Sequence, residues 1–289
     1  MYALYAAAFA TFSTIIHKKL LYKEHALEFI TILSISNFIF TLPFLYKSDF
    51  NFSFYVLLII IFISLINSLG AYYLTKAFRH LEISIASPLM GFEPGFVVLL
   101  SFLFLKEGIT YSQMWGLILT LIGGYLLEVR WGFSLLQPIR EAIKSKYIHY
   151  GLLAILIYSF SAIISRYIVN TNNNFSLNIY TYLILVHFFV SIILFFSLML
   201  KYDGIYGIKN GIKNMGWLLL PSSFFSVAHG FFTLFAISLP EANVGLVLAI
   251  KRISIFFETL IGGELFHDPN LFMKVIASVI IILGVYLVI

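Results

Sequence analysis

Charge lies inside two otherwise apolar segments of this sequence, GFEPGFVVLLSFLFLKE (residues 91–107) and LAIKRISIFFETLIGGE (residues 248–264). The first segment holds Glu93, and the second holds the adjacent pair Lys251 and Arg252. A charged side chain near the centre of a bilayer costs about 2.5 to 3.5 kcal/mol even on lenient insertion scales, so such residues usually face a bundle interior or a wet cavity. The two segments therefore predict helices that line a polar space.

The composition is that of an integral membrane protein. The chain has 289 residues, of which 61% are hydrophobic and 11% are charged, and its mean hydropathy is +0.98. The formal net charge of +5 comes from basic residues in short segments between apolar runs, a pattern of membrane topology that predicts no nucleic-acid partner. The absence of cysteine excludes disulfides and thiolate metal sites.

Ten apolar segments are long enough to be membrane helices, at about 20 residues per span. A polar stretch from Arg130 to Lys146 follows the fifth of them. We therefore predict a five-helix repeat over residues 1–130, a connecting loop over 131–147 and a second five-helix repeat over 148–289. The ten predicted spans are 2–17, 27–46, 54–76, 83–105, 112–129, 149–169, 178–200, 216–238, 242–263 and 270–289.

The two halves resemble each other. The sequence AFRHLE at 77–82 is echoed by AISLPE at 236–241, and in both halves an apolar helix follows that ends at an acidic residue, Glu107 or Glu264. An odd number of spans per repeat makes the second copy enter the membrane upside down. The predicted fold is an all-α polytopic membrane protein with two five-helix inverted-topology repeats around a central cavity.

The spacing of Pro94, Glu107 and Gly123 resembles the EamA-type repeat of the drug/metabolite transporter (DMT) superfamily. In that repeat a helix contains a proline, an apolar stretch and then a glutamate, and a glycine-containing helix follows; here Pro94 lies 13 residues before Glu107. The resemblance implies ten helices, a central substrate cavity, and export or exchange of small metabolites by alternating access. The second half departs from the pattern, because Lys251 stands where the proline is expected, 13 residues before Glu264.

The predicted ninth helix carries a polar stripe. At 100° per residue, Asn243, Lys251, Ser254 and Glu258 fall within about 80° of one another, whereas Arg252 points roughly 100° away from Lys251. Lys251 and Glu258 are separated by about 10 Å of helix rise. A substrate, a water molecule or another helix is expected between them.

Two interpretations of the buried charges are open. Glu93, Lys251, Arg252 and Glu258 either form a structural ion-pair network that fixes the packing of the halves, or face the substrate path. In the second case Lys251 or Arg252 holds a carboxylate or phosphate, or Glu93 exchanges a coupling proton. Two acidic and two basic groups make a balanced set, which suits a zwitterion such as an amino acid.

Further candidates are histidines and polar residues within the apolar helices. His229 and His187 have side chains that can carry protons, although a packing role is the plainer interpretation, above all for His187. Tyr72, Tyr73 and Asn67 offer hydrogen bonds to a substrate, and core or lipid contact is the alternative for each.

Prolines predict a break in the fourth helix. Pro88 and Pro94 remove backbone donors near Glu93, and Gly95 follows directly. Either a discontinuous-helix binding site or a static kink fits this pattern. The helix-end residues Glu107 and Glu264 are not expected to be ligands. A separate set of glycines is expected to permit close helix approach: Gly116, Gly123, Gly124, Gly262 and Gly263.

Basic residues also predict the orientation. Of the 18 lysines and arginines, 13 lie in or beside the loops after odd-numbered helices, three lie near even-numbered connections and two are buried. Because basic loops stay in the cytoplasm, we expect a multi-pass protein of the cell (plasma or inner) membrane with both termini extracytoplasmic. The family resemblance implies the opposite orientation.

Three functions are considered. The first is a secondary-active exporter or exchanger of small polar or zwitterionic metabolites, such as amino acids, or of drugs. The second is a nucleotide-sugar or phosphorylated-metabolite exchanger of the same superfamily, which needs Lys251 and Arg252 unpaired. The third, an intramembrane enzyme or lipid-handling scaffold, has no supporting motif. We expect no enzymatic activity, no cofactor and no metal, a small-molecule substrate within the lipid bilayer, and a monomer or homodimer.

Overall fold

Long apolar runs become helices in this chain because a lipid environment leaves backbone hydrogen bonds no partner outside the segment. The structure, a computed structural model, describes residues 1–81, 83–106, 108–126, 144–169, 177–201, 204–266 and 271–288. All regular structure in these ranges is helical. Hydroxyl groups within the helices bond to carbonyls of the preceding turn, as Ser64 does to Ile60 and Ser68 to Ser64, so they add little polar cost.

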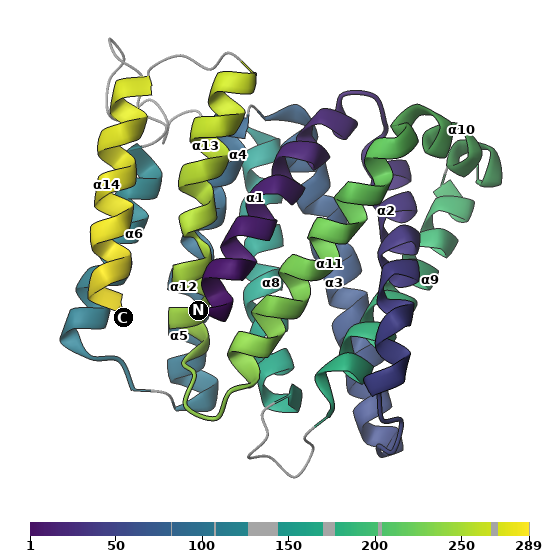
Figure 1. Ribbon diagram of the computed structural model, residues 1–289, viewed down its shortest axis with the longest axis horizontal. Coiled ribbons are helices and arrows are strands. Elements are labelled where there is room, and N and C mark those ends of the chain that lie inside the picture. Colours follow the sequence, from purple (N-terminus) through teal and green to yellow (C-terminus); the bar gives the residue numbers. More distant parts are fainter. Residues whose placement is uncertain are drawn as a thin grey trace.

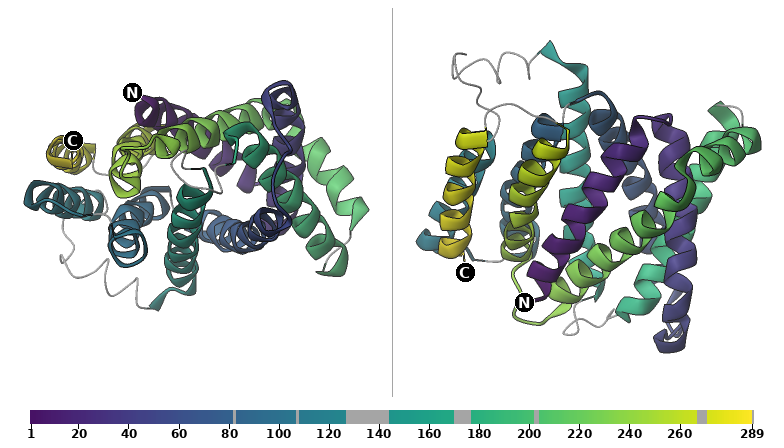
Figure 2. Two further views of the ribbon diagram at one scale, coloured as in Figure 1. Left: turned by 90° about the horizontal axis from the view of Figure 1, so that it is seen from below. Right: turned by 45° about the horizontal axis from the view of Figure 1, so that its top comes forward.

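The helices form two layers, each of which mixes helices from both halves of the sequence (Figure 1). Seen from below, the layers appear as two rows (Figure 2, left). The front layer contains α14 (Leu271–Val288), α12 (Val244–Lys251) with α13 (Ile253–Leu265), α1 (Tyr2–Leu21), α11 (Leu219–Ser238) and α2 (Ala26–Thr41). The rear layer contains α6 (Tyr111–Leu126), α4 (Ile83–Leu89) with α5 (Glu93–Leu105), α8 (Lys146–Val169), α3 (Phe54–His80) and α9 (Ile179–Lys201).

The main packing contacts within each layer have a counterpart in the other layer. α1 packs against α11 in front, and α8 packs against α3 behind. In the same way, α13 and α12 lie against α1, and α5 lies against α8. Across the layers, α14 packs against α6 at one edge and α2 against α9 at the other, while α12 meets α5 and α13 meets α4 in between.

Short elements complete the chain. The 3₁₀ segments are η1 (Leu42–Lys47), η2 (Met90–Phe92) and η3 (Gly216–Leu218). The amphipathic helix α10 (Ile205–Met215) lies at one end of the bundle (Figure 1) and was not predicted from the sequence. Its Gly207 and Gly211 pack closely on Glu28 and Glu24 at the start of α2.

Within the described ranges, five helical segments are long and apolar enough to cross a membrane, so the chain is a membrane protein with several apolar helices. The predicted all-α membrane class is confirmed, whereas the ten-span count remains a prediction. Two predicted spans, the fourth and the ninth, are each divided into two shorter helices, and α6 has 16 residues. The predicted domain boundaries also remain predictions, because residues 127–143 lie outside the described ranges.

Two glycines make the contact between α6 and α14 unusually close. A Cβ atom added to Gly123 would lie 2.7 Å from Ile281 Cγ1 and 2.9 Å from the Ala277 carbonyl. Reciprocally, a Cβ added to Gly284 would lie 2.7 Å from the carbonyl of Gly116 and 2.6 Å from Thr120 Oγ1. The predicted role of Gly123 in close helix approach is therefore confirmed.

Replacing Gly123 with alanine is expected to lower the free energy of unfolding by about 1 to 3 kcal/mol, because the added methyl group forces the two backbones apart. Gly230→Ala is the matched control, since a Cβ at that helical position meets no atom within 4 Å. Unfolding of the detergent-purified variants, followed by circular dichroism, measures both effects. Equal stability of the two variants would contradict the close contact.

Candidate functional site

The helix break predicted beside Pro94 is present. α4 ends at Leu89, the 3₁₀ segment η2 follows, and α5 begins at Glu93. The proline therefore stands in the first turn of a new helix, where its missing N–H is tolerated. Glu93 is the first residue of α5, where a carboxylate is favoured by the positive end of the helix dipole.

The ninth predicted helix is also broken, which the sequence did not predict. α12 ends at Lys251, and Arg252 stands between it and α13 with φ −69° and ψ −4°. The Arg252 N–H lies within hydrogen-bonding distance of the carbonyls of both Leu248 and Ala249, so the chain tightens locally toward a 3₁₀ turn. Such a turn within a long helix often marks a functional hinge.

The two breaks are joined by an ion pair. Arg252 Nη2 pairs with Glu93 Oε2, and Lys251 Nζ lies 4.0 Å from the same oxygen. The three residues are only 5 to 8% exposed. Because α5 belongs to the rear layer and α12 to the front layer, this pair connects the layers in the interior of the bundle.

Lys251 and Arg252 approach the same carboxylate. Adjacent residues of a helix point about 100° apart, yet the tips of both side chains lie near Glu93 Oε2. Their long, flexible stems allow them to converge on one group from different directions. Asn243, placed on the predicted polar stripe, instead caps α12 by accepting a hydrogen bond from the Leu246 N–H at 3.3 Å.

Glu258 supplies the second buried carboxylate. The hydroxyl groups of Ser254, Ser87 and Thr14 face it, and Arg252 is its electrostatic neighbour. Lys251 also interacts electrostatically with Glu258. Glu258 is therefore an electrostatic neighbour of the two basic residues that face Glu93.

A polar patch of α1 and α11 adjoins this group. His17 Nε2 lies 3.2 Å from Ser13 Oγ and 3.1 Å from Ser226 Oγ, and the two hydroxyl groups are 2.9 Å apart. His229 is an electrostatic neighbour of both His17 and Lys251. His17 and Ser13 were not among the predicted site residues, although a histidine inside an apolar first helix was a signal for them.

The remaining predicted residues are placed elsewhere. Tyr73 packs on Tyr150 of α8, and Tyr72 packs between Tyr73 and the ammonium group of Lys76. Asn67 is half-buried on the same helix. His187 Nδ1 donates to the Leu183 carbonyl of its own helix at 2.9 Å, which agrees with a packing role.

Glu264 is exposed near the end of α13, in agreement with its predicted exclusion from the site. Its counterpart in the first half, Glu107, lies outside the described residues, as does Glu82 of the first repeated motif.

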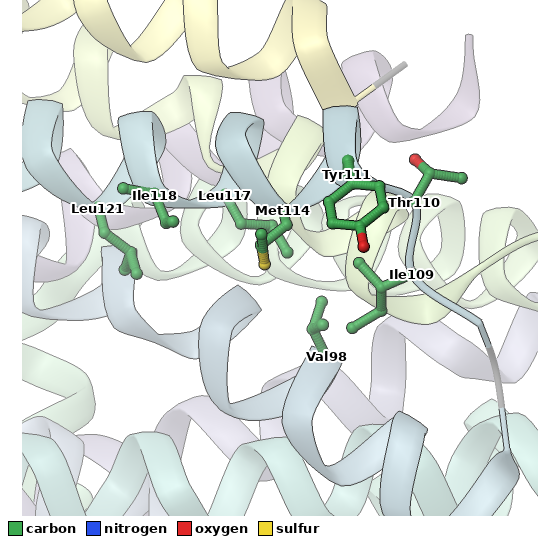
Figure 3. Close-up of a pocket in the computed structure, with 8 residues that line it drawn as sticks. All are labelled: Val98, Ile109, Thr110, Tyr111, Met114, Leu117, Ile118 and Leu121. Atoms are coloured by element: carbon green, nitrogen blue, oxygen red, sulfur yellow. The ribbon is translucent and has the colours of Figure 1, made fainter.

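An apolar cavity of about 340 Å³ lies between α5 and α6, apart from the charged group (Figure 3). Thr110 and Tyr111 are the only polar side chains in its lining. No charged side chain is among the described residues that line the cavity. Its lining residues are Val98, Ile109, Thr110, Tyr111, Met114, Leu117, Ile118 and Leu121.

Glu93→Gln is expected to lower the free energy of unfolding by about 3 to 5 kcal/mol, because it leaves the buried Arg252 charge without its partner. The double variant Glu93→Gln with Arg252→Gln is expected to regain much of this loss. Chemical unfolding in detergent measures the three proteins, and Glu264→Gln, an exposed carboxylate of the same region, is the control. A double variant less stable than Glu93→Gln alone would contradict the pairing.

Solved structures share the fold of this chain, and 29 of their chains match it. One, titled "Crystal structure of protein", has a TM-score of 0.66 at 13% sequence identity and covers 98% of this chain and 94% of its own. At this identity the likeness concerns the fold alone. No curated protein matches the sequence.

A family match covers the first part of the chain. The model of the EamA-like transporter family matches residues 1–129, a range that contains the first broken helix and Glu93. This confirms the resemblance seen in the spacing of Pro94, Glu107 and Gly123. Residues 1–129 of this chain thus match the model of the EamA-like transporter family, which belongs to the drug/metabolite transporter superfamily.

Proposed function

We propose that the chain is a secondary-active transporter that exports or exchanges small metabolites bearing a carboxylate, such as amino acids, by alternating access. The observation that carries this proposal is the environment of the Lys251 ammonium group. Among the described residues no hydrogen bond reaches its Nζ atom, and the nearest Glu93 carboxylate oxygen is 4.0 Å away. A buried ammonium group without a close partner is costly, and a carboxylate ligand would satisfy it.

The surroundings of Lys251 favour an anionic group of the substrate. α13, a helix of 13 residues, begins just after the break, so its positive dipole end lies beside the ammonium group. Arg252 Nε is a buried donor without a hydrogen-bond partner among the described residues. A carboxylate at this break would interact with the Lys251 ammonium group, the N-terminus of α13 and the Arg252 Nε donor.

Glu258 favours a positive group at the other end of the same substrate. Its carboxylate, lined by the hydroxyl groups of Ser254, Ser87 and Thr14, is matched to an ammonium group. Since Lys251 and Glu258 interact electrostatically, one small zwitterion would neutralise both. This arrangement supports an amino-acid-like substrate.

The pairing of Arg252 with Glu93 argues against the nucleotide-sugar alternative. That function requires two basic groups free for phosphate, and Arg252 is held in an ion pair. The structural and the substrate-binding interpretations of the buried charges can thus each apply to a different residue. In our proposal the Arg252–Glu93 pair has the structural role, and Lys251 binds substrate.

Alternating access is commonly built on two repeats of inverted topology, and we propose that the chain consists of such repeats. The reciprocal positions of Gly123 and Gly284 support this, because each receives the backbone of the other helix. The breaks at η2 and at Arg252 fall in the fourth and ninth predicted helices, which are equivalent in the two halves. Such discontinuous helices are a common setting for substrate sites in transporters.

Lys251→Gln is expected to raise the substrate concentration for half-maximal counterflow by about tenfold, since a charged hydrogen bond is lost. Lys251→Arg keeps the charge and is the matched comparison. A thermal-shift screen of the common amino acids on purified protein selects the substrate, and counterflow in proteoliposomes gives the measurement. Unchanged half-saturation in Lys251→Gln would remove Lys251 from the site.

A further inference from the structure

Lys18 is a buried basic residue with a defined structural partner. It lies in the last turn of α1, is 3% exposed, and its Nζ donates to the carbonyls of Phe78 and Leu81, each at 2.7 Å. These carbonyls belong to the C-terminal end of α3, where the helix offers them no N–H partner. The ammonium group therefore caps α3, at the end where the helix dipole favours a positive charge.

Arg166 makes the corresponding contact in the second half. It lies in the last turn of α8 and is 5% exposed. Its guanidinium group donates to the carbonyls of Ile237, of Leu239 at 2.6 Å and of Pro240 at 3.0 Å. These carbonyls belong to the C-terminal end of α11, so Arg166 caps α11.

The two caps use equivalent positions of the repeated motif. When Ala77 is aligned with Ala236, Phe78 corresponds to Ile237, and Leu81 corresponds to Pro240. Lys18 and Arg166 each lie in the last turn of the first helix of their half. A lysine and an arginine in different halves thus perform the same capping contact on the same two backbone positions.

The caps lie at opposite ends of the bundle. In Figure 1, α1 rises to the top, where α3 also ends, whereas α8 and α11 both end at the bottom. Each cap connects the two layers, because Lys18 joins front α1 to rear α3, and Arg166 joins rear α8 to front α11. Outside these contacts, α1 packs mainly on α11 and α13 of its own layer, and α3 packs mainly on α8 and α9.

We propose that Lys18 and Arg166 are a symmetric pair of positioning residues that close the space between the layers, one at each end, and that they open in turn during transport. This inference rests on the proposed alternating access. Each cap holds the helix that leads into a broken helix, α3 into α4 or α11 into α12. Loss of one cap would therefore favour opening of the bundle at that end and leave the other end closed.

The chain has no cysteine, so a single introduced thiol reports access to the interior. Gly230 suits this purpose, because it is half-buried on α11 one turn after Ser226, and a Cβ there meets no atom within 4 Å. A membrane-impermeant maleimide is applied to Gly230→Cys from either side of sealed vesicles. A separate Lys23→Cys variant, in the exposed connection after α1, identifies the Lys18 side.

Lys18→Met is expected to raise the maleimide labelling rate about tenfold from the Lys18 side alone. Loss of the charged hydrogen bonds shifts the equilibrium between the closed and open forms at that end by about this factor. Arg166→Met should do so from the other side alone. Lys18→Arg and Arg166→Lys should restore the original rates. Lys19→Met and Lys47→Met, which change exposed lysines at the two ends, should have no effect.

Labelling that rises equally from both sides, or from neither, would overturn the proposal. If a methionine variant fails to give a monodisperse protein, Lys18→Gln and Arg166→Gln, which keep one donor, are tested under the same criterion. Side-specific labelling without transport of any amino acid would support the caps and refute the proposed substrate class. Transport with side-independent labelling would refute the caps alone.

Discussion

The ion pair between Glu93 and Arg252 is the interaction on which the interior arrangement depends. It joins the first residue of α5 to the residue between α12 and α13, so it fixes two broken helices of different layers at one level. Neither charge would be tolerated alone in an apolar interior. Lys251 lies beside this pair, with its Nζ atom 4.0 Å from Glu93 Oε2.

Polar groups in this protein fall into two kinds, according to whether the protein itself satisfies them. The hydrogen-bonding groups of Lys18 and Arg166 are directed at backbone carbonyls at helix ends, which is a structural use of charge. Lys251 and Glu258, by contrast, have neighbours but no close opposite charge bonded to them among the described residues. This second kind of group is the one to which our proposal assigns substrate binding.

The sequence predicted the fold class and one of the two helix breaks. Composition and span length gave the membrane class, and Pro94 with Gly95 gave the break before α5, since proline has a defined effect on helices. The break at Arg252 has no proline or glycine to announce it, so the sequence predicted one continuous helix there. Lys18 was counted with the loops, because its partners on α3 are known only once helix neighbours are known.

The close contact between α6 and α14 has a consequence for biosynthesis. Gly123 leaves the ribosome long before Gly284, so the groove on α6 faces lipid or the insertion machinery until translation has nearly finished. The faces of α1 and α3 that receive α11 and α8 are likewise uncovered in a nascent first half. A polypeptide ending after α6 would therefore leave these helix faces without the partners that cover them in the full chain.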